Sequence, residues 1–227
     1  MEGSAIALGA VLGLLAGWFV IVRVVERVPE PTTVPVPARV AIAVVNAALW
    51  AADVNRFNRW WIAATYFVVF STLLAVSVVD LRIYRIPDRI VFPAVAATLV
   101  LVLVATYAAA PPGASVTKIV TYALAGSGVY FAILFVFHVV YPRGMGFGDV
   151  KLAILMGLSL GWLGHSFFSA FYLVLIALFL GCLFGIGFGL AVRLIRGRGG
   201  AFPFGPALAL ATVYVVLTFD RYVANLP

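Results

Sequence analysis

The chain has 227 residues, of which 65% are hydrophobic and 10% charged, and its mean hydropathy is +1.16. This composition excludes a soluble globular domain and predicts an integral membrane protein of the all-α, polytopic class. The net charge of +7 does not indicate nucleic-acid binding, because the basic residues fall in short loops between long apolar runs. We therefore expect the lipid bilayer as a partner and no nucleic acid.

Apolar segments follow one another along the chain. A helix that rises 1.5 Å per residue needs about 20 apolar residues to cross roughly 30 Å of hydrocarbon, and by this measure we predict about eight membrane-spanning helices. The first predicted helix follows Glu2 and lacks the basic segment that precedes the apolar part of a secretory signal. We therefore expect that this helix is retained and not cleaved as a signal peptide. Whether the short second span crosses fully stays open. The predicted spans are 4–22, 40–52, 60–79, 90–107, 119–140, 150–163, 167–192 and 204–219.

Basic residues are distributed unevenly between the two sets of alternating loops. The positive-inside rule makes the richer set cytoplasmic and places both termini outside. We expect a multi-pass protein of the inner or plasma membrane. The richer set holds Arg23, Arg27, Arg39, Arg82, Arg85, Arg89, Arg143, Lys151, Arg193, Arg196 and Arg198, and the poorer set holds Arg56, Arg59, Lys118 and Arg221.

The first cytoplasmic loop, residues 23–39, is rich in proline. Four prolines lie between Pro29 and Pro37, which disfavours a helix and predicts a short extended connector. The connector is too short for a separate domain, so we predict one membrane-embedded domain over residues 1–227. The single cysteine, Cys182, cannot form a disulfide framework or a cysteine metal site within the chain, and we expect no metal and no cofactor.

Glycines recur every four residues in three of the predicted helices. Small residues at this spacing let helix backbones approach closely in lipid. We favour packing within the chain, although a homo-oligomer formed through these glycine-rich faces stays open. The glycines are Gly9, Gly13 and Gly17; Gly157 and Gly161; and Gly181, Gly185 and Gly189.

Two carboxylates lie at the predicted membrane edge. Asp80 ends the third span and Asp149 opens the sixth, and two crossings between them return the chain to the same side. A carboxylate in lipid costs about 2.5 to 3.5 kcal/mol at the bilayer centre, so such residues are functional by default. Two carboxylates that lie side by side share one proton. Such a pair can activate a water molecule to attack a peptide carbonyl, as in an aspartic protease. We interpret Glu2, Glu26, Glu30, Asp53 and Asp220 as solvated or interfacial.

Glycines and prolines surround these carboxylates in the sequence. The glycines before Asp149 would let a substrate backbone approach, or they form only a helix-entry turn. Segment 202–206 predicts either an unwound stretch, before or within the last helix, that pairs with a peptide, or a helix that begins at proline. The predicted site-shaping residues are Gly144, Gly146, Gly148, Lys151, Pro203, Gly205 and Pro206.

Three motifs occur in order along the chain: D-x5-I-P-D at 80–88, G-M-G-F-G-D-V-K at 144–151 and P-F-G-P at 203–206. Together they resemble the type IV prepilin peptidase family of membrane aspartyl proteases with a G-x-G-D element. The resemblance covers the chain from the third span onward. It implies that Asp80 and Asp149 are catalytic, and that Lys151 can bias their electrostatics. It also implies a prepilin or pseudopilin precursor as substrate, cut after a glycine on the cytoplasmic side, just before a hydrophobic helix.

The resemblance has one departure. Bifunctional members of the family place a large cytoplasmic loop with paired cysteines between the first two helices and use it to N-methylate the cleaved product. Segment 23–39 is short and contains no cysteine. We therefore expect a peptidase without methyltransferase activity.

Two other functions stay open. A protease of the presenilin or signal peptide peptidase type shares the G-x-G-D element, but it usually carries a Tyr-Asp pair, whereas Val79 precedes Asp80 here. A small transporter could also use two carboxylates at the membrane edge. A transporter is expected to show repeated halves and polar residues near mid-bilayer, and neither is evident.

Overall fold

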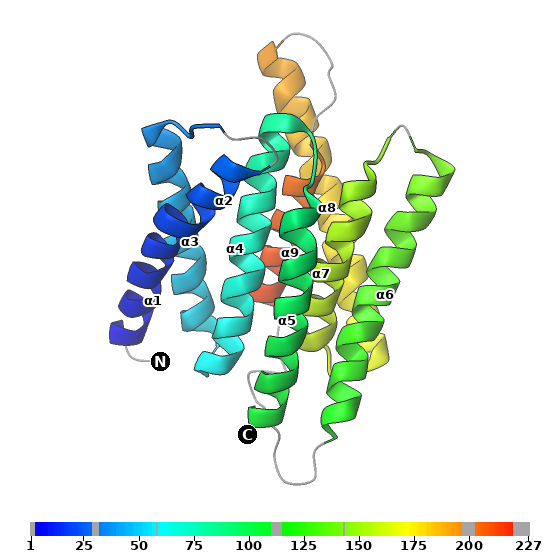
Figure 1. Cartoon of the computed structure of the whole chain (residues 1–227). Helices are drawn as coiled ribbons and strands as arrows, with labels where there is room; N and C mark the ends of the chain where they lie inside the picture. Colours follow the sequence, from blue (N-terminus) through cyan, green and yellow to red (C-terminus); the bar gives the residue numbers. More distant parts are fainter. Residues whose placement is uncertain are drawn as a thin grey trace.

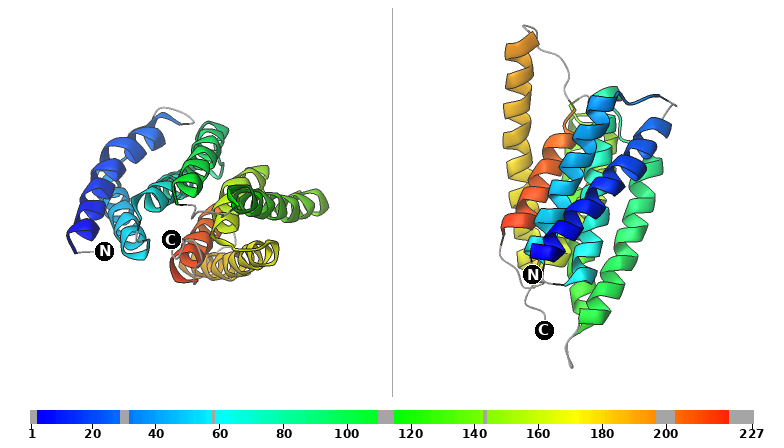
Figure 2. Two further views of the ribbon diagram at one scale, coloured as in Figure 1. Left: turned by 90° about the horizontal axis from the view of Figure 1, so that it is seen from below. Right: turned by 90° about the vertical axis from the view of Figure 1, so that its left-hand side faces the viewer.

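The computed structural model describes residues 3–28, 32–57, 59–109, 115–142, 144–196 and 203–219. Over these residues the chain is a bundle of helices without strands, which confirms the predicted all-α fold (Figures 1 and 2). Arg143, Arg198 and Arg221 of the predicted loops lie outside the described residues. The helices are α1 (Gly3–Ala16), the π-helix η1 (Gly17–Ile21), α2 (Val22–Arg27), α3 (Val36–Arg56), α4 (Trp60–Ile83), α5 (Asp88–Ala109), α6 (Val116–Val140), α7 (Phe147–Leu163), α8 (Phe167–Arg196) and α9 (Gly205–Thr218).

In the described part of the chain, six helical segments are long and apolar enough to cross a membrane, which confirms a polytopic membrane protein. The predicted second span is longer than expected, because α3 has 21 residues. In contrast, α7 has 17 residues and α9 has 14, so the predicted count of about eight full crossings is not confirmed. The six segments are Gly3–Arg27, Val36–Arg56, Trp60–Ile83, Asp88–Ala108, Val116–Val140 and Phe167–Leu194.

Helix extends into both ends of the predicted connector 23–39. Helix α2 continues to Arg27, and α3 begins at Val36 with Pro37 in its first turn, where a missing N–H costs no helical hydrogen bond. The Glu26 carboxylate ties the two ends together, since it accepts hydrogen bonds from the Val34 N–H at 3.0 Å and the Arg39 guanidinium at 2.6 Å. The non-helical part is therefore shorter than the sequence predicts, and its residues 29–31 lie outside the described residues.

Helices α6 and α7 pack closely because glycines of the two helices face each other. A Cβ added to Gly126 of α6 would lie 2.6 Å from the Cα of Gly161 on α7, and one added to Gly157 would overlap the backbone at Gly126. Across the same contact, the Ser127 hydroxyl donates a hydrogen bond to the Ile154 carbonyl at 3.0 Å. The glycines thus fix the distance between α6 and α7.

The N-terminal glycines serve the same purpose against α3. A Cβ on Gly13 would lie 2.9 Å from the Asn46 carbonyl oxygen, and the Asn46 side chain donates to the Gly13 carbonyl at 2.8 Å. The predicted packing within the chain is thereby confirmed for Gly9, Gly13 and Gly17, which all face α3. Homo-oligomerisation through the remaining glycine-rich face of α8 stays a prediction.

Helices α4 and α7 run in opposite directions, so the end of α4 and the start of α7 lie at the same end of the bundle, which we call the dyad end (Figure 1). A contact at the opposite end aligns them: the Tyr66 hydroxyl of α4 donates to the Ser159 carbonyl of α7 at 3.0 Å. The ring of Tyr66 also stacks on Phe57 and Trp162. This buried aromatic cluster holds the two helices that carry Asp80 and Asp149.

Asp53 differs from its predicted solvated position. Because α3 extends to Arg56, Asp53 lies in its last turn and is fully buried. Neither of its carboxylate oxygens has a hydrogen-bond partner among the described residues. The interpretation of Asp53 as a solvated loop residue is therefore wrong.

The contact between α6 and α7 yields a test with a matched control on the same helix. Replacing Gly126→Ala should lower the free energy of unfolding by about 1–3 kcal/mol, because the new methyl group overlaps the α7 backbone. Gly128→Ala should leave it unchanged or slightly raise it, because no atom lies within 4 Å of the added Cβ. Denaturant-induced unfolding in detergent micelles measures both. Equal stability of the two variants would contradict the glycine contact.

Candidate active site

Asp80 lies in the last turn of α4 and only 5% of its surface is exposed. The helix ends three residues later, at Ile83, because Tyr84 adopts a left-handed conformation with φ of 55°, while its N–H donates to the Asp80 carbonyl at 2.8 Å. A non-glycine residue in this conformation is uncommon and marks a constrained turn. The turn sends the chain into α5 and leaves the Asp80 side chain facing the bundle.

Asp149 lies in the first turn of α7 and is 6% exposed. Gly146 caps this helix, and the Asp149 N–H donates to the Gly146 carbonyl at 3.1 Å. The loop before the cap is held by His138 of α6, whose Nδ1 donates to the Met145 carbonyl at 2.8 Å, because a carbonyl oxygen can only accept. His138 therefore fixes the loop that presents Asp149.

Gly205, the first residue of α9, lies against both carboxylates. A Cβ built on Gly205 would be 2.8 Å from Oδ2 of Asp80 and 3.4 Å from Oδ1 of Asp149. The two side chains thus face one small space beside this glycine, as the topology of the sequence predicts. Oδ1 of Asp149 is buried and has no hydrogen-bond partner within the described part of the chain.

Helix ends supply the electrostatic setting of the pair. Both α7 and α9 begin beside the carboxylates, and the N-terminal end of a helix favours a negative charge. The backbone of Gly205 forms a hydrogen bond with the Asp80 carboxylate. This contact offsets the position of Asp80 at the C-terminal end of α4, which disfavours a negative charge.

Segment 202–206 combines elements of its two predicted forms, because residues 203 and 204 are not helical and α9 begins at Gly205. Pro206 lies in the first turn of α9, where proline costs no helical hydrogen bond, and the helix continues without interruption. Its described part is therefore a short non-helical stretch followed by a helix with proline in its first turn, and Phe202 lies outside the described residues. Pairing of this segment with a peptide stays a prediction.

Lys151 joins two of the sequence motifs. Its ammonium group lies 2.6 and 2.8 Å from the two carboxylate oxygens of Asp88, the first residue of α5, and 5.1 Å from the centre of the Phe147 ring. The pair connects the I-P-D motif to the G-D-V-K motif. Its direct partners are thus Asp88 and the rings of Phe147 and Phe92, and any influence on the two buried aspartates acts through space.

A pocket of about 240 Å³ opens at the two carboxylates. Ile86 packs between two glycines there, since a Cβ on Gly148 would lie 2.8 Å from its Cβ and one on Gly205 would lie 3.1 Å from its Cδ1. At roughly 30 Å³ per water molecule, the pocket has room for several waters or a short stretch of extended peptide. It is lined by Asp80, Tyr84, Arg85, Ile86, Gly146, Phe147, Gly148, Asp149 and Lys151.

The predicted site-shaping residues divide into two groups. Gly146, Gly148 and Lys151 line the pocket, and Gly205 touches both carboxylates. Gly144, Pro203 and Pro206 do not line it. A Cβ on Gly144 would overlap the Tyr141 ring, so that glycine shapes the loop and not the pocket.

Four pocket residues are not predicted from the sequence: Tyr84, Arg85, Ile86 and Phe147. Ile86 belongs to the I-P-D motif, and Phe147 to the glycine-rich turn, so motif membership was the available signal for these two. Nothing in the sequence indicates the left-handed turn at Tyr84. No group of three or more His, Cys, Asp or Glu side chains arranged to hold a metal ion occurs among the described residues.

These features define a polytopic helical membrane protein with an aspartate pair buried at one end of its bundle. The profile of the type IV leader peptidase family matches residues 67–190, more than half of the chain and including both aspartates. The chain therefore belongs to the type IV leader peptidase family.

Curated relatives carry the name prepilin leader peptidase/N-methyltransferase. The protein of Burkholderia pseudomallei strain 1026b is 32% identical over 180 residues, which cover 77% of this chain and 53% of that relative. The Escherichia coli K12 protein is 30% identical over 154 residues (67% and 62%), and the Bacillus subtilis 168 protein is 29% identical over 190 residues (81% and 67%). The chain spans about half the length of the first of these relatives. No solved structure matches this one.

Proposed function

We propose that this protein is an intramembrane aspartyl endopeptidase that removes the leader peptide of prepilin or pseudopilin precursors at the cytoplasmic edge of the membrane. The observation that carries the proposal is the approach of the Asp80 and Asp149 carboxylates beside Gly205. Membership of the type IV leader peptidase family supports it. The whole of residues 1–227 acts as one peptidase domain.

The chemistry follows from two carboxylates in a partly dry pocket. Like charges at about 4 Å repel by about 4 kcal/mol at an effective dielectric near 20, so the pair holds one proton between them. The ionised member takes a proton from a water as the water oxygen bonds to the scissile carbonyl carbon, and the protonated member gives its proton to the carbonyl oxygen. The C–N bond then breaks: the leaving amine receives a proton from one carboxyl group, and a hydroxyl of the tetrahedral intermediate gives its proton to the other as the carbonyl re-forms, so the pair again holds one proton.

The glycines give a peptide access to this water. Gly146 and Gly148 line the pocket without side chains, so an extended backbone can lie against the start of α7. Oδ1 of Asp149 has no hydrogen-bond partner among the described residues, so it can accept a hydrogen bond from the attacking water. Asp80 is held by the Gly205 backbone and faces the same space.

The distribution of arginine supports a cytoplasmic site and outward termini. The turns at the dyad end include Arg82, Arg85 and Arg89, and the positive-inside rule assigns such loops to the cytoplasm. Helix α1 begins and α9 ends at the opposite end of the bundle (Figure 1). The membrane is the inner or plasma membrane of the cell.

The aspartate pair can be tested by co-expressing a prepilin and following the size of the product. Asp80→Asn and Asp149→Asn should each reduce cleavage by at least about 100-fold, because each removes one member of the acid–base pair. Asp53→Asn is the matched control, a buried aspartate at the opposite end of the bundle, and it should cleave normally. Undiminished cleavage by either dyad variant would reject the protease assignment.

Gly205 offers a second test that leaves both carboxylates in place. Gly205→Ala should lower kcat by more than about tenfold, because the methyl group falls 2.8 Å from Oδ2 of Asp80 and crowds the water site. Gly146→Ala should have a smaller effect, since its methyl group would meet Oδ2 of Asp149 at an ordinary 3.5 Å. Cleavage rates of the purified variants measure the difference, and equal rates would place the reacting water elsewhere.

We also propose that the protein does not N-methylate the product. The connector between α2 and α3 is short and the chain has no cysteine pair. Incubation of purified protein with a prepilin and S-adenosylmethionine should give a cleaved product with an unmodified N-terminus by mass spectrometry. A methylated N-terminus would overturn this part of the proposal.

A further inference from the structure

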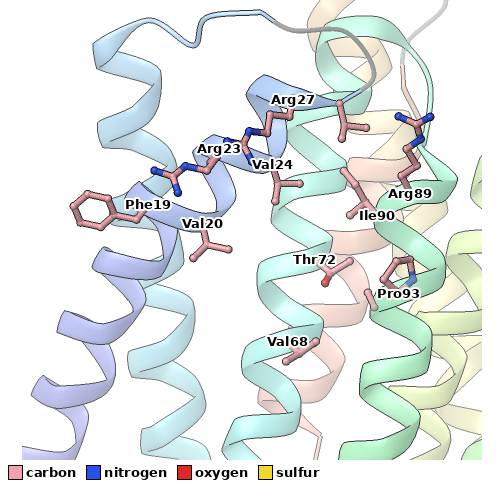
Figure 3. Close-up of a pocket in the computed structure, with 12 residues that line it drawn as sticks. Phe19, Val20, Arg23, Val24, Arg27, Val68, Thr72, Arg89, Ile90 and Pro93 are labelled. Carbon is pink, nitrogen blue, oxygen red and sulfur yellow. The ribbon is translucent and has the colours of Figure 1, made fainter.

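A second pocket, of about 570 Å³, lies between the N-terminal helix and α5, with α4 as its floor (Figure 3). Residues of η1 and α2 form one wall and the first turns of α5 form the other. It shares no lining residue with the pocket at Asp80 and Asp149. The proposed peptidase activity therefore does not account for it.

Three arginines surround the mouth of this pocket: Arg23 and Arg27 from α2, and Arg89 from α5 (Figure 3). All three are exposed, and no acidic side chain lines the pocket. Within the described residues none of the three forms an ion pair, whereas the nearby carboxylates of Glu26 and Asp88 are bound by Arg39 and Lys151. Among the described residues, no ion pair offsets this positive charge at the dyad end of the bundle.

Both walls of the pocket contain a departure from regular α-helical hydrogen bonding. In η1 the Val22 N–H donates to the Gly17 carbonyl, five residues earlier, and this wider turn precedes α2, which crosses over α4 (Figure 3). On the facing wall, Pro93 cannot donate the helical hydrogen bond that the Arg89 carbonyl would accept. The helices of both walls therefore depart from the regular α-helical hydrogen-bond pattern beside the pocket.

Below the arginines the pocket continues into an apolar groove. An adjoining cavity of about 420 Å³ shares Val20, Val68 and Thr72 with the first one and runs further along α4. Apart from Ser71 and Thr72, its lining is apolar. Phe19 and Val20, which border the opening, are large hydrophobic residues with more than half of their surface exposed. A molecule that diffuses within the bilayer can enter from this side.

We propose that this pocket binds one anionic phospholipid, with its phosphate between Arg23, Arg27 and Arg89 and an acyl chain along the groove at Val20 and Val68. Guanidinium groups match phosphate oxygens in charge and in hydrogen-bond geometry. Basic pockets between transmembrane helices at the cytoplasmic side are the known form of such sites. A peptide occupant is disfavoured, because the continuous apolar groove provides no partners for backbone polar groups.

The test measures lipid binding to the purified full chain in neutral detergent by native mass spectrometry. Wild type should retain one phosphatidylglycerol at a concentration at least about tenfold lower than it needs for phosphatidylcholine with the same acyl chains. The triple variant Arg23→Gln, Arg27→Gln, Arg89→Gln should lose this preference. A control that also removes three cations, Arg59→Gln, Lys118→Gln, Arg193→Gln, should keep it.

A second variant keeps every charge and is independent of whether the triple variant folds. Val20→Trp fills the point where the two cavities join, so it should weaken phosphatidylglycerol binding at least about fivefold. Millimolar inorganic phosphate should not displace the lipid, because phosphate lacks the acyl chain. The proposal would be overturned if wild type bound the two lipids equally, if both triple variants lost the preference equally, or if Val20→Trp bound normally. Displacement of the lipid by phosphate or by a prepilin peptide would also overturn it.

Discussion

The structure depends on burying two carboxylates at one end of an apolar bundle. Such groups are tolerated in a membrane protein only when their surroundings stabilise charge or let the pair share a proton. Here the N-terminal ends of α7 and α9 converge on Asp80 and Asp149, and Gly205 lets α9 come close enough for its backbone to contact Asp80. The absence of a side chain at Gly205 therefore determines whether this end of the bundle can hold both acids.

Further contacts between helices and loops position the two acids relative to each other. Gly126 and Gly157 set α7 against α6, and His138 then holds the loop that leads into α7. The ion pair between Asp88 and Lys151 connects the start of α5 to the first turns of α7. This ion pair and the approach of Gly205 to both carboxylates join segments that are distant in sequence, so the three motifs form one cluster in space. A loss of any of them would act on the geometry of the pair and not on its chemical groups.

Sequence reasoning located the helices and the two aspartates, because membrane length, loop charge and motif spacing are properties of the chain itself. The sequence does not show that Gly205 touches both carboxylates, since that contact depends on how α9 packs. Sequence reasoning also misplaced Asp53, because the end of a helix near the interface cannot be read from hydropathy when Arg56 follows within one turn. Tyr84 shows the same limit: its left-handed conformation is imposed by the turn and not by its residue type.

Burial of an acid does not by itself define a site in this protein. Asp53 is as buried as Asp80, and neither of its oxygens has a described hydrogen-bond partner, but it lines none of the pockets at the dyad end. Asp80 differs because a second acid, an open pocket and a helix N-terminus all meet it. Helix α4 also forms the floor of the arginine-rimmed pocket, on residues Val68 and Thr72. Both pockets lie against α4, and α5 also connects them, because it forms a wall of the arginine pocket and its Asp88 pairs with Lys151 of the dyad pocket. A lipid bound at the first pocket would therefore act on the second by moving α4 or α5, which would change the separation of Asp80 from Asp149.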